Sequence, residues 1–166
     1  MTQPKAVPRI RTATPEDLAA LPALEAAADR LLKAEVGYRA LPAPGPPTSG
    51  ETLFILVAGN PTVGFARVDE VGGQAHLEQV SVHPDSAGRG VGRSLVEAAI
   101  DGARIRGYEF MTLCTFRDVP FNARFYASCG FAELAEPGKA LAALRAYEAL
   151  PGLDDLGRRV VMRLRL

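Results

Sequence analysis

The chain has 166 residues, of which 48% are hydrophobic and 23% charged, and its 19 Lys and Arg residues balance its 19 Asp and Glu residues. This length suits one domain, so we expect a single domain over residues 1–166, with residues 1–8 as a flexible tail. The zero formal net charge argues against a nucleic-acid partner, because such proteins usually carry clustered basic charge. The sequence also lacks an apolar stretch that could cross a bilayer or serve as a signal peptide, so we expect a cytoplasmic protein with no membrane partner.

The first predicted elements are a short strand at residues 10–13 and a helix directly after it. Thr14 is a good N-cap, Pro15 fits the first helical position, and Asp17 completes a capping box. Pro22 favours an interruption of this helix. The apolar residues that should share its buried face are Leu18, Leu21, Leu24, Ala27 and Leu31.

A segment rich in proline and glycine follows at residues 41–50, and its composition excludes regular structure. We expect a loop over one domain, because too few residues precede it to form a separate core. Three strands are then predicted, at residues 53–58, 62–71 and 76–82, with tight turns between them. In the third strand Leu77 has one parity and Val80 and Val82 have the other. This shift predicts a β-bulge, which locally splays a strand from its neighbour.

A second long helix is predicted to begin near Gly90 and to end at Gly107. Its apolar stripe consists of Val91, Leu95, Ala99 and Ala103. The remaining elements are a strand at 110–116, a short helix at 122–129, a strand at 131–134, a helix at 140–150 and a strand at 158–166. This order is typical of an α/β or α+β sheet domain.

The turn before the second long helix reads Gly88-Arg89-Gly90-Val91-Gly92. Its glycines allow unusual backbone torsions, and the free amides and dipole of a helix start favour a bound phosphate. The alternative is a flexible turn without a ligand. A Rossmann motif would need glycine at Arg93, and a P-loop would need glycine at Ala87 and lysine at Arg93, so the sequence matches neither.

Two segments together resemble the GNAT superfamily of N-acetyltransferases. Val80 to Asp85 (VSVHPD), followed by residues 88–95 (GRGVGRSL), resembles the acetyl-CoA-binding motif Q/R-x-x-G-x-G/A that follows a bulged strand in that family. Ala87 stands where the family has Gln or Arg. Residues 122–131 (NARFYASCGF) are similar to a second family segment, in the family's order and at its usual separation.

The resemblance implies a mixed, mostly antiparallel twisted sheet with helices on both faces and a splayed, bulged central strand. It implies transfer of the acetyl group of acetyl-CoA to a primary amine by direct attack in a ternary complex, with Tyr126 as general acid. Backbone groups of Val80 and Val82 would pair with the pantetheine arm, and the amides of residues 88–93 would hold the pyrophosphate. The cofactor-binding residues implied are Val80, Ser81, Val82, Gly88, Arg89, Gly90, Val91, Gly92, Arg93, Asn122 and Tyr126.

The residues themselves add a candidate base. A lysine-like amine has a pKa near ~10.4, so only about one molecule in a thousand is neutral at pH 7, and a carboxylate must accept its proton. Glu78 is our candidate, because it lies where the bulge should open; the alternative is a solvated strand residue. His76 and His83 are weaker candidates. Asn122 and Tyr126 are four residues apart and should share a helix face.

Partners and ligands follow from the same observations. The two cysteines, Cys114 and Cys129, lack zinc-site spacing, so we expect reduced thiols and no bound metal. The acceptor is a small-molecule or peptide amine that the sequence does not identify, and the resemblance allows a homodimer. The competing hypothesis is an acyl-CoA-binding module or sensor without catalysis.

Overall fold

The computed structural model describes residues 6–36, 51–119, 122–149 and 157–166, so the predicted loop at 41–50 and residues 1–5 of the expected tail lie outside them. The described strands form one sheet in the order β1-β2-β3-β4-β5-β7-β6. Neighbouring strands are antiparallel except β4 and β5, which are parallel. The strands are β1 (Ile10–Thr12), β2 (Thr52–Ala58), β3 (Gly64–Val71), β4 (Gln74–Val82), β5 (Phe110–Phe116), β6 (Ala132–Glu133) and β7 (Arg159–Arg165).

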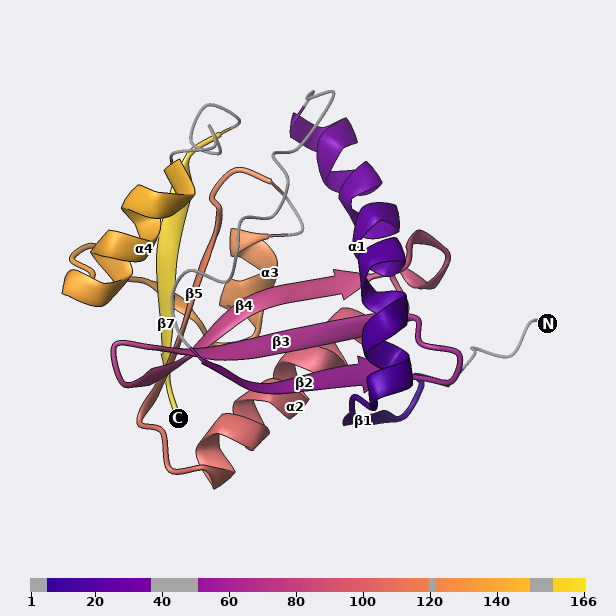
Figure 1. Ribbon diagram of the computed structural model, residues 1–166. Helices are drawn as coiled ribbons and strands as arrows, with labels where there is room; N and C mark the ends of the chain where they lie inside the picture. The colour runs from indigo at the N-terminus through magenta and orange to yellow at the C-terminus, as the bar shows by residue number, and fades with distance from the viewer. Residues whose placement is uncertain (1–5, 37–50, 120–121, 150–156) are drawn as a thin grey trace.

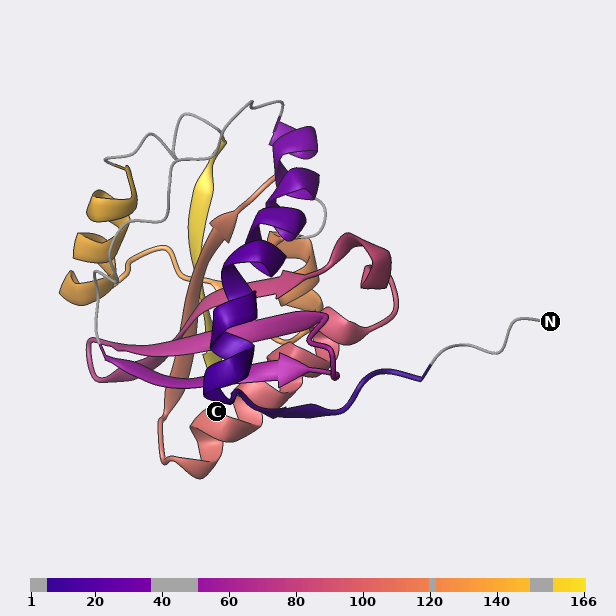
Figure 2. The ribbon, with the colours of Figure 1, turned by 45° about the vertical axis from the view of Figure 1, so that its right-hand side comes forward.

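Helices cover both faces of this sheet (Figures 1 and 2). α1 (Pro15–Val36) and α4 (Lys139–Ala149) lie on one face, which we call the α1 face. α2 (Val91–Ile105) and α3 (Ala123–Ser128) lie on the other, the α2 face, and a short 3-10 helix, η1 (Pro84–Ser86), follows β4. The predicted mixed sheet with helices on both faces is therefore confirmed.

The predicted capping box begins α1. The Thr14 backbone N–H donates to the Asp17 carboxylate at 2.8 Å, and the Asp17 N–H donates to the Thr14 hydroxyl at 3.4 Å. Two details of our prediction for this helix are wrong. Pro22 lies inside a continuous helix, and only the middle of the predicted apolar stripe, Leu21, Leu24 and Ala27, is buried. Its ends, Leu18 and Leu31, are 45% and 44% exposed, because the helix outreaches the part of the sheet that it covers.

The main core lies on the α2 face. The predicted stripe of α2 is buried there with residues from all the long strands: Val91, Leu95, Ala99 and Ala103 pack with Phe54, Ala66, Val68, Leu77, Met111 and Leu113. A smaller cluster on the α1 face joins Leu21 and Leu24 of α1 to Val57 and Phe65 of the sheet.

The central strands β4 and β5 separate after a short paired stretch. Their only paired residues are Ala75 with Met111 and His76 with Thr112, although both strands continue beyond this point. The register between β3 and β4 shifts at the same place, since Arg67 faces Gln79 while Val68 faces Leu77. Glu78 is thus the extra residue of a β-bulge. Figure 1 shows the two strands diverging into a wedge, which confirms the predicted splayed, bulged central strand.

Candidate active site

Beyond His76, the edge of β4 that faces the wedge pairs with no strand among the described residues, and we call it the free edge of β4. The His83 N–H donates to the Val63 carbonyl on the β3 side at 2.8 Å. Because backbone groups alternate in direction along a strand, those of Ser81 also point to β3, whereas those of Val80 and Val82 point into the wedge. Ser81 is 6% exposed, and its hydroxyl accepts a hydrogen bond from the Gln79 side chain at 3.2 Å.

The glycine turn continues from the end of β4 into α2. Gly88 and Gly90 have φ values of 72° and 79°, which only glycine adopts freely. A methyl group placed on Gly88 would meet no atom within 4 Å, so an approaching ligand would find open backbone there. Gly90 is the N-cap of α2, and the first N–H groups of a helix have no partner within it. The turn therefore presents backbone N–H donors at the positive end of the dipole of α2, a helix of 15 residues.

The two arginines of this motif lie differently. Arg89 is exposed in the turn. Arg93 donates hydrogen bonds to the Ser128 hydroxyl at 2.7 Å and to the Ser128 carbonyl at 3.3 Å, and its guanidinium carbon lies 5.8 Å from the centre of the Phe125 ring. Its side chain thus joins the start of α2 to the end of α3, which leaves its backbone amide as the group that faces the turn. The Ala87 N–H donates to the Pro84 carbonyl and closes η1.

The short helix α3 carries the other residues of the second motif. Asn122 is its N-cap, and the Asn122 carbonyl accepts a hydrogen bond from the Tyr126 N–H at 2.9 Å. The Tyr126 ring packs edge-on against Phe125 and Phe131, with ring centres 5.1 and 6.1 Å away. Burial, with a smaller contribution from Cys129, raises the pKa of the Tyr126 phenol above its ordinary value. The phenol therefore keeps its proton at neutral pH.

Glu78 and His76 meet on the α1 face at the mouth of the wedge. The His76 Nε2 atom lies 3.5 Å from a Glu78 carboxylate oxygen, and its Nδ1 atom lies 2.8 Å from the Thr112 hydroxyl oxygen. The His76 side chain is 1% exposed, whereas that of Glu78 is 30% exposed. Burial lowers the pKa of His76 to about 4; the Asp69 charge opposes this shift and the Arg159 charge adds to it. His76 is therefore neutral at physiological pH.

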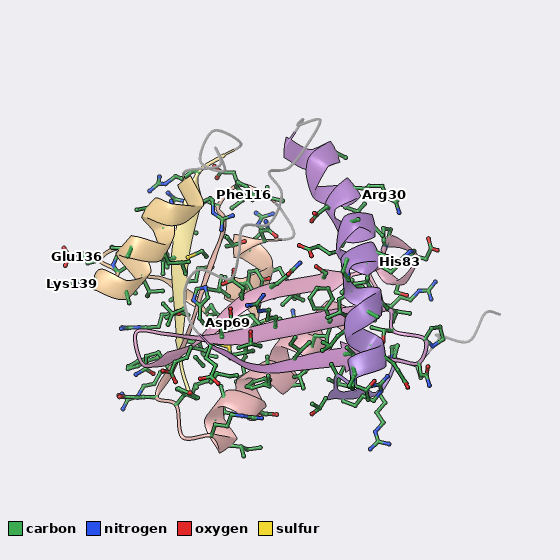
Figure 3. The ribbon with its side chains drawn as sticks, in the orientation of Figure 1. Arg30, Asp69, His83, Phe116, Glu136 and Lys139 are labelled. Carbon is green, nitrogen blue, oxygen red and sulfur yellow. The ribbon has the colours of Figure 1, made fainter. Side chains whose placement is uncertain are left out.

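A buried ion pair lies beside this group on the same face. Asp69, which is opposite His76 in the β3–β4 register, is 1% exposed. Arg67 donates to both Asp69 carboxylate oxygens at 2.9 Å. Figure 3 shows Asp69 in the part of the sheet between α1 and α4.

The sequence prediction ranked His76 below Glu78 and did not include Thr112, whereas the structure brings all three side chains together. A useful signal was present, because His76 and Glu78 are two residues apart on a strand, and such residues normally share a face. Thr112 could not be found in this way, since its contact depends on the pairing of β4 with β5. His83 is the turn residue that its position suggested: its Nδ1 atom accepts the Asp85 N–H at 3.2 Å.

Two kinds of feature are absent from the described residues. No group of three or more His, Cys, Asp and Glu side chains there lies close enough to hold a metal ion. None of the helices in those same ranges is both long and apolar enough to span a membrane.

Comparisons with known proteins agree with this architecture. The family described as "Acetyltransferase (GNAT) family" matches residues 24–131. The ribosomal-protein-S18-alanine N-acetyltransferase of Escherichia coli has a similar structure at 22% identity and a TM-score of 0.61, with 95% of this chain and 92% of that chain covered.

Two more solved structures share the fold. One is the PaiA N-acetyltransferase of Thermoplasma acidophilum in complex with coenzyme A (14% identity, TM-score 0.62, 97% and 99% coverage). The other is nourseothricin acetyltransferase (23% identity, TM-score 0.63, 95% and 97% coverage). Because the family match spans more than half of the chain and includes the wedge and the glycine turn, the chain belongs to the GNAT family of acetyltransferases.

Proposed function

We propose that this protein transfers the acetyl group of acetyl-CoA to a primary amine by direct attack in a ternary complex. The observation that carries the proposal is the free edge of β4, which begins at the Glu78 bulge and is followed, after η1, by the glycine turn. An extended chain with amide groups can pair with such an edge as an added strand. The pantetheine arm of coenzyme A has that chemistry, and its pyrophosphate suits the amides of residues 88–93.

Val80 and Val82 would supply the backbone pairing, while Ser81 would hold the strand in register from the β3 side. A backbone N–H near Val80 would also stabilise the negative charge that develops on the thioester oxygen during attack. Asn122 and the Arg89 side chain would lie along the remaining path of the cofactor. None of these contacts requires a metal ligand.

Tyr126 would donate a proton to the leaving thiolate. Its raised pKa keeps the phenol protonated, but it also makes the phenol a weaker acid. The proton would therefore move only as the carbon–sulfur bond breaks and charge develops on sulfur.

Glu78 would accept the proton of the attacking amine, directly or through a water molecule. It is the bulged residue of β4, and its carboxylate is partly exposed at the mouth of the wedge. A carboxylate in that position can reach both solvent and an amine that enters from the α1 face.

The first test is an assay of thiol release from acetyl-CoA with a panel of primary amines. One structural relative is named for an alanine of a ribosomal protein and another for nourseothricin, so the panel should contain peptides with a free N-terminus as well as small amines. We expect turnover with at least one acceptor. Tight binding of coenzyme A without turnover on any amine would instead favour an acyl-CoA-binding module or sensor.

The second test separates the acid from the binding site. Tyr126→Phe should lower kcat about 100-fold, as loss of a general acid typically does, while the Kd for coenzyme A stays within about twofold. Tyr108→Phe is a matched control, because that phenol donates to Glu70 at 2.7 Å away from the proposed site. An unchanged kcat for Tyr126→Phe would remove this tyrosine from the mechanism.

A further inference from the structure

We propose that His76 is a positioning residue that, held by Thr112, aims the Glu78 carboxylate at the incoming amine. This inference rests on the proposed function of Glu78 as the base. It adds a group that does not touch the substrate and that acts only through its contact with Glu78.

The pleat of β4 places the side chains of His76 and Glu78 on one face, and the free edge of the strand begins at the bulge. His76 faces Asp69 and Gln79 faces Arg67, so the three-residue step from 76 to 79 spans only two residues of β3. The inserted residue, Glu78, comes within 3.5 Å of His76 at the carboxylate, which places that carboxylate on the α1 face. His76 and Glu78 are two residues apart, so a regular strand would also place them on one face. The bulge removes Glu78 from the pairing with β3.

The contact with Glu78 decides which ring nitrogen of His76 carries the proton, because the Thr112 hydroxyl can either donate to Nδ1 or accept from it. A neutral imidazole has one N–H and one lone pair. If Thr112 donates its hydroxyl proton to Nδ1, the Nε2–H points at the Glu78 carboxylate and is attracted to it. The other tautomer would turn a lone pair toward a carboxylate, which is unfavourable, so the Glu78 contact selects the Nε2–H tautomer. In that tautomer Thr112 donates to Nδ1 and holds the ring in place.

Burial keeps His76 neutral in this role. Among the surrounding charges, Asp69 on β3 favours a proton on the ring but is itself paired with Arg67, and Arg159 on β7 acts against a proton there. Arg163 on β7 is opposite Thr112 in the register and adds a positive charge on that side. Because His76 is neutral and buried, it supplies a fixed N–H donor and does not itself accept the proton of the amine.

A fixed donor to Glu78 has a measurable consequence. A hydrogen bond to the ionised form of a carboxyl favours that form, so removal of the bond raises its pKa. The acid limb of the kcat–pH profile, where the base becomes protonated, should then move to higher pH. If His76 had a purely structural role, its substitution would lower the melting temperature of the protein but would leave the acid limb in place.

The experiment compares the kcat–pH profiles of four variants at saturating acetyl-CoA, with melting temperatures as a second measurement. His76→Leu should lower kcat at pH 7 about tenfold and move the acid limb upward by about one pH unit, because it removes an N–H that lies beside the carboxylate. His76→Gln keeps an N–H donor near the position of Nε2 and should restore kcat to within about threefold of the wild type and the limb to within about half a pH unit. Thr112→Val should give an intermediate effect, because the ring remains but loses the contact that holds it at Nδ1. His83→Gln, the control at the other histidine of the chain, should leave the limb unchanged.

An acid limb that stays in place for both His76→Leu and Thr112→Val would overturn the inference. So would a His76→Gln variant that is as impaired as His76→Leu but has the melting temperature of the wild type. Should His76→Leu fail to fold, His76→Gln and Thr112→Val still decide the matter. Glu78→Gln separates the two proposals: if it keeps full turnover, the base assignment fails, whereas if it is inactive and the His76 variants are normal, only the present inference fails.

Discussion

The two faces of the sheet are built from different residues. On the α2 face the central positions are apolar, and Leu95, Val96, Ala99 and Ala103 of α2 are all 0% exposed. On the α1 face the middle of the sheet buries the polar residues Asp69, His76, Ser81 and Thr112. Because the α1 face has only a small apolar cluster and buries these polar side chains, we expect the α2 face to supply most of the stability and the α1 face to position the proposed base.

The polar residues of the α1 face are tolerated because they have partners. Asp69 is bound by Arg67, His76 contacts Thr112, and Ser81 accepts from Gln79. A buried polar group without a partner costs roughly 1–3 kcal/mol, so such a cluster persists only when its contacts are made. These contacts also fix the directions of the side chains, which an apolar cluster of similar size would not do.

The comparison predicts its largest effect on stability for a truncation on the α2 face. Leu95→Ala should lower the free energy of unfolding by about 2–5 kcal/mol, because it removes a fully buried side chain at the centre of the core. The kcat per folded molecule should change little. Urea denaturation at pH 7.5, together with the thiol-release assay, measures both quantities.

Ile105→Ala on the same helix is the matched control for this change. Ile105 is 84% exposed, so its truncation should stay within about 0.5 kcal/mol of the wild type. A loss below about 1 kcal/mol for Leu95→Ala would mean that the α2 face is not the main source of stability.

The second prediction concerns how stability depends on pH on the α1 face. His76 has a pKa of about 4 in the folded protein and about 6.5 in the unfolded chain. The unfolded state therefore binds more protons between these values, and stability falls as the pH drops from about 6.5 toward 4. The contribution of His76 should be a loss of about 2 kcal/mol between pH 7.5 and pH 5.

This contribution is isolated by comparison of the wild type with His76→Gln. Urea unfolding at both pH values should show a smaller loss of stability in the variant, since its side chain does not titrate. Equal losses in the two proteins would show that the pKa of His76 is not lowered by folding. The surroundings of His76 would then be more open to water than its 1% exposure implies.

Much of this fold could be predicted from local patterns in the sequence. The capping box at Thr14 marks the start of α1, the apolar stripe from Val91 to Ala103 gives the buried face of α2, and glycine pairs mark the turns. The bulge in β4 was visible as a shift of parity. These features depend on residues close together in the chain, so a single sequence contains the information.

Features that depend on pairing between distant segments could not be predicted in the same way. The exposed ends of the α1 stripe, Leu18 and Leu31, depend on how far the sheet extends beneath the helix. The stacking of Arg159 over Phe116 and of Arg163 over Phe110 depends on the pairing of β5 with β7. The contact between His76 and Thr112 joins residues that are 36 positions apart, so it could not be read from the local sequence.

The smallest predicted effect concerns the connection between the two sides of the wedge. Arg93 belongs to the glycine motif of α2, but its side chain binds the end of α3, the helix that carries Tyr126. Arg93→Ala should lower kcat about fivefold, because the hydrogen bonds of an exposed arginine are worth only about 1 kcal/mol, while the Kd for coenzyme A should change less.

Arg93→Lys should not restore kcat, since one ammonium group cannot reproduce the fork of donors that reaches both Ser128 oxygens. Arg104→Ala, which breaks an exposed pair with Asp101 on the same helix, serves as the control. If Arg93→Ala instead weakens binding of coenzyme A tenfold and leaves kcat unchanged, the side chain leaves Ser128 to bind the cofactor, and the placement of Tyr126 does not depend on this connection.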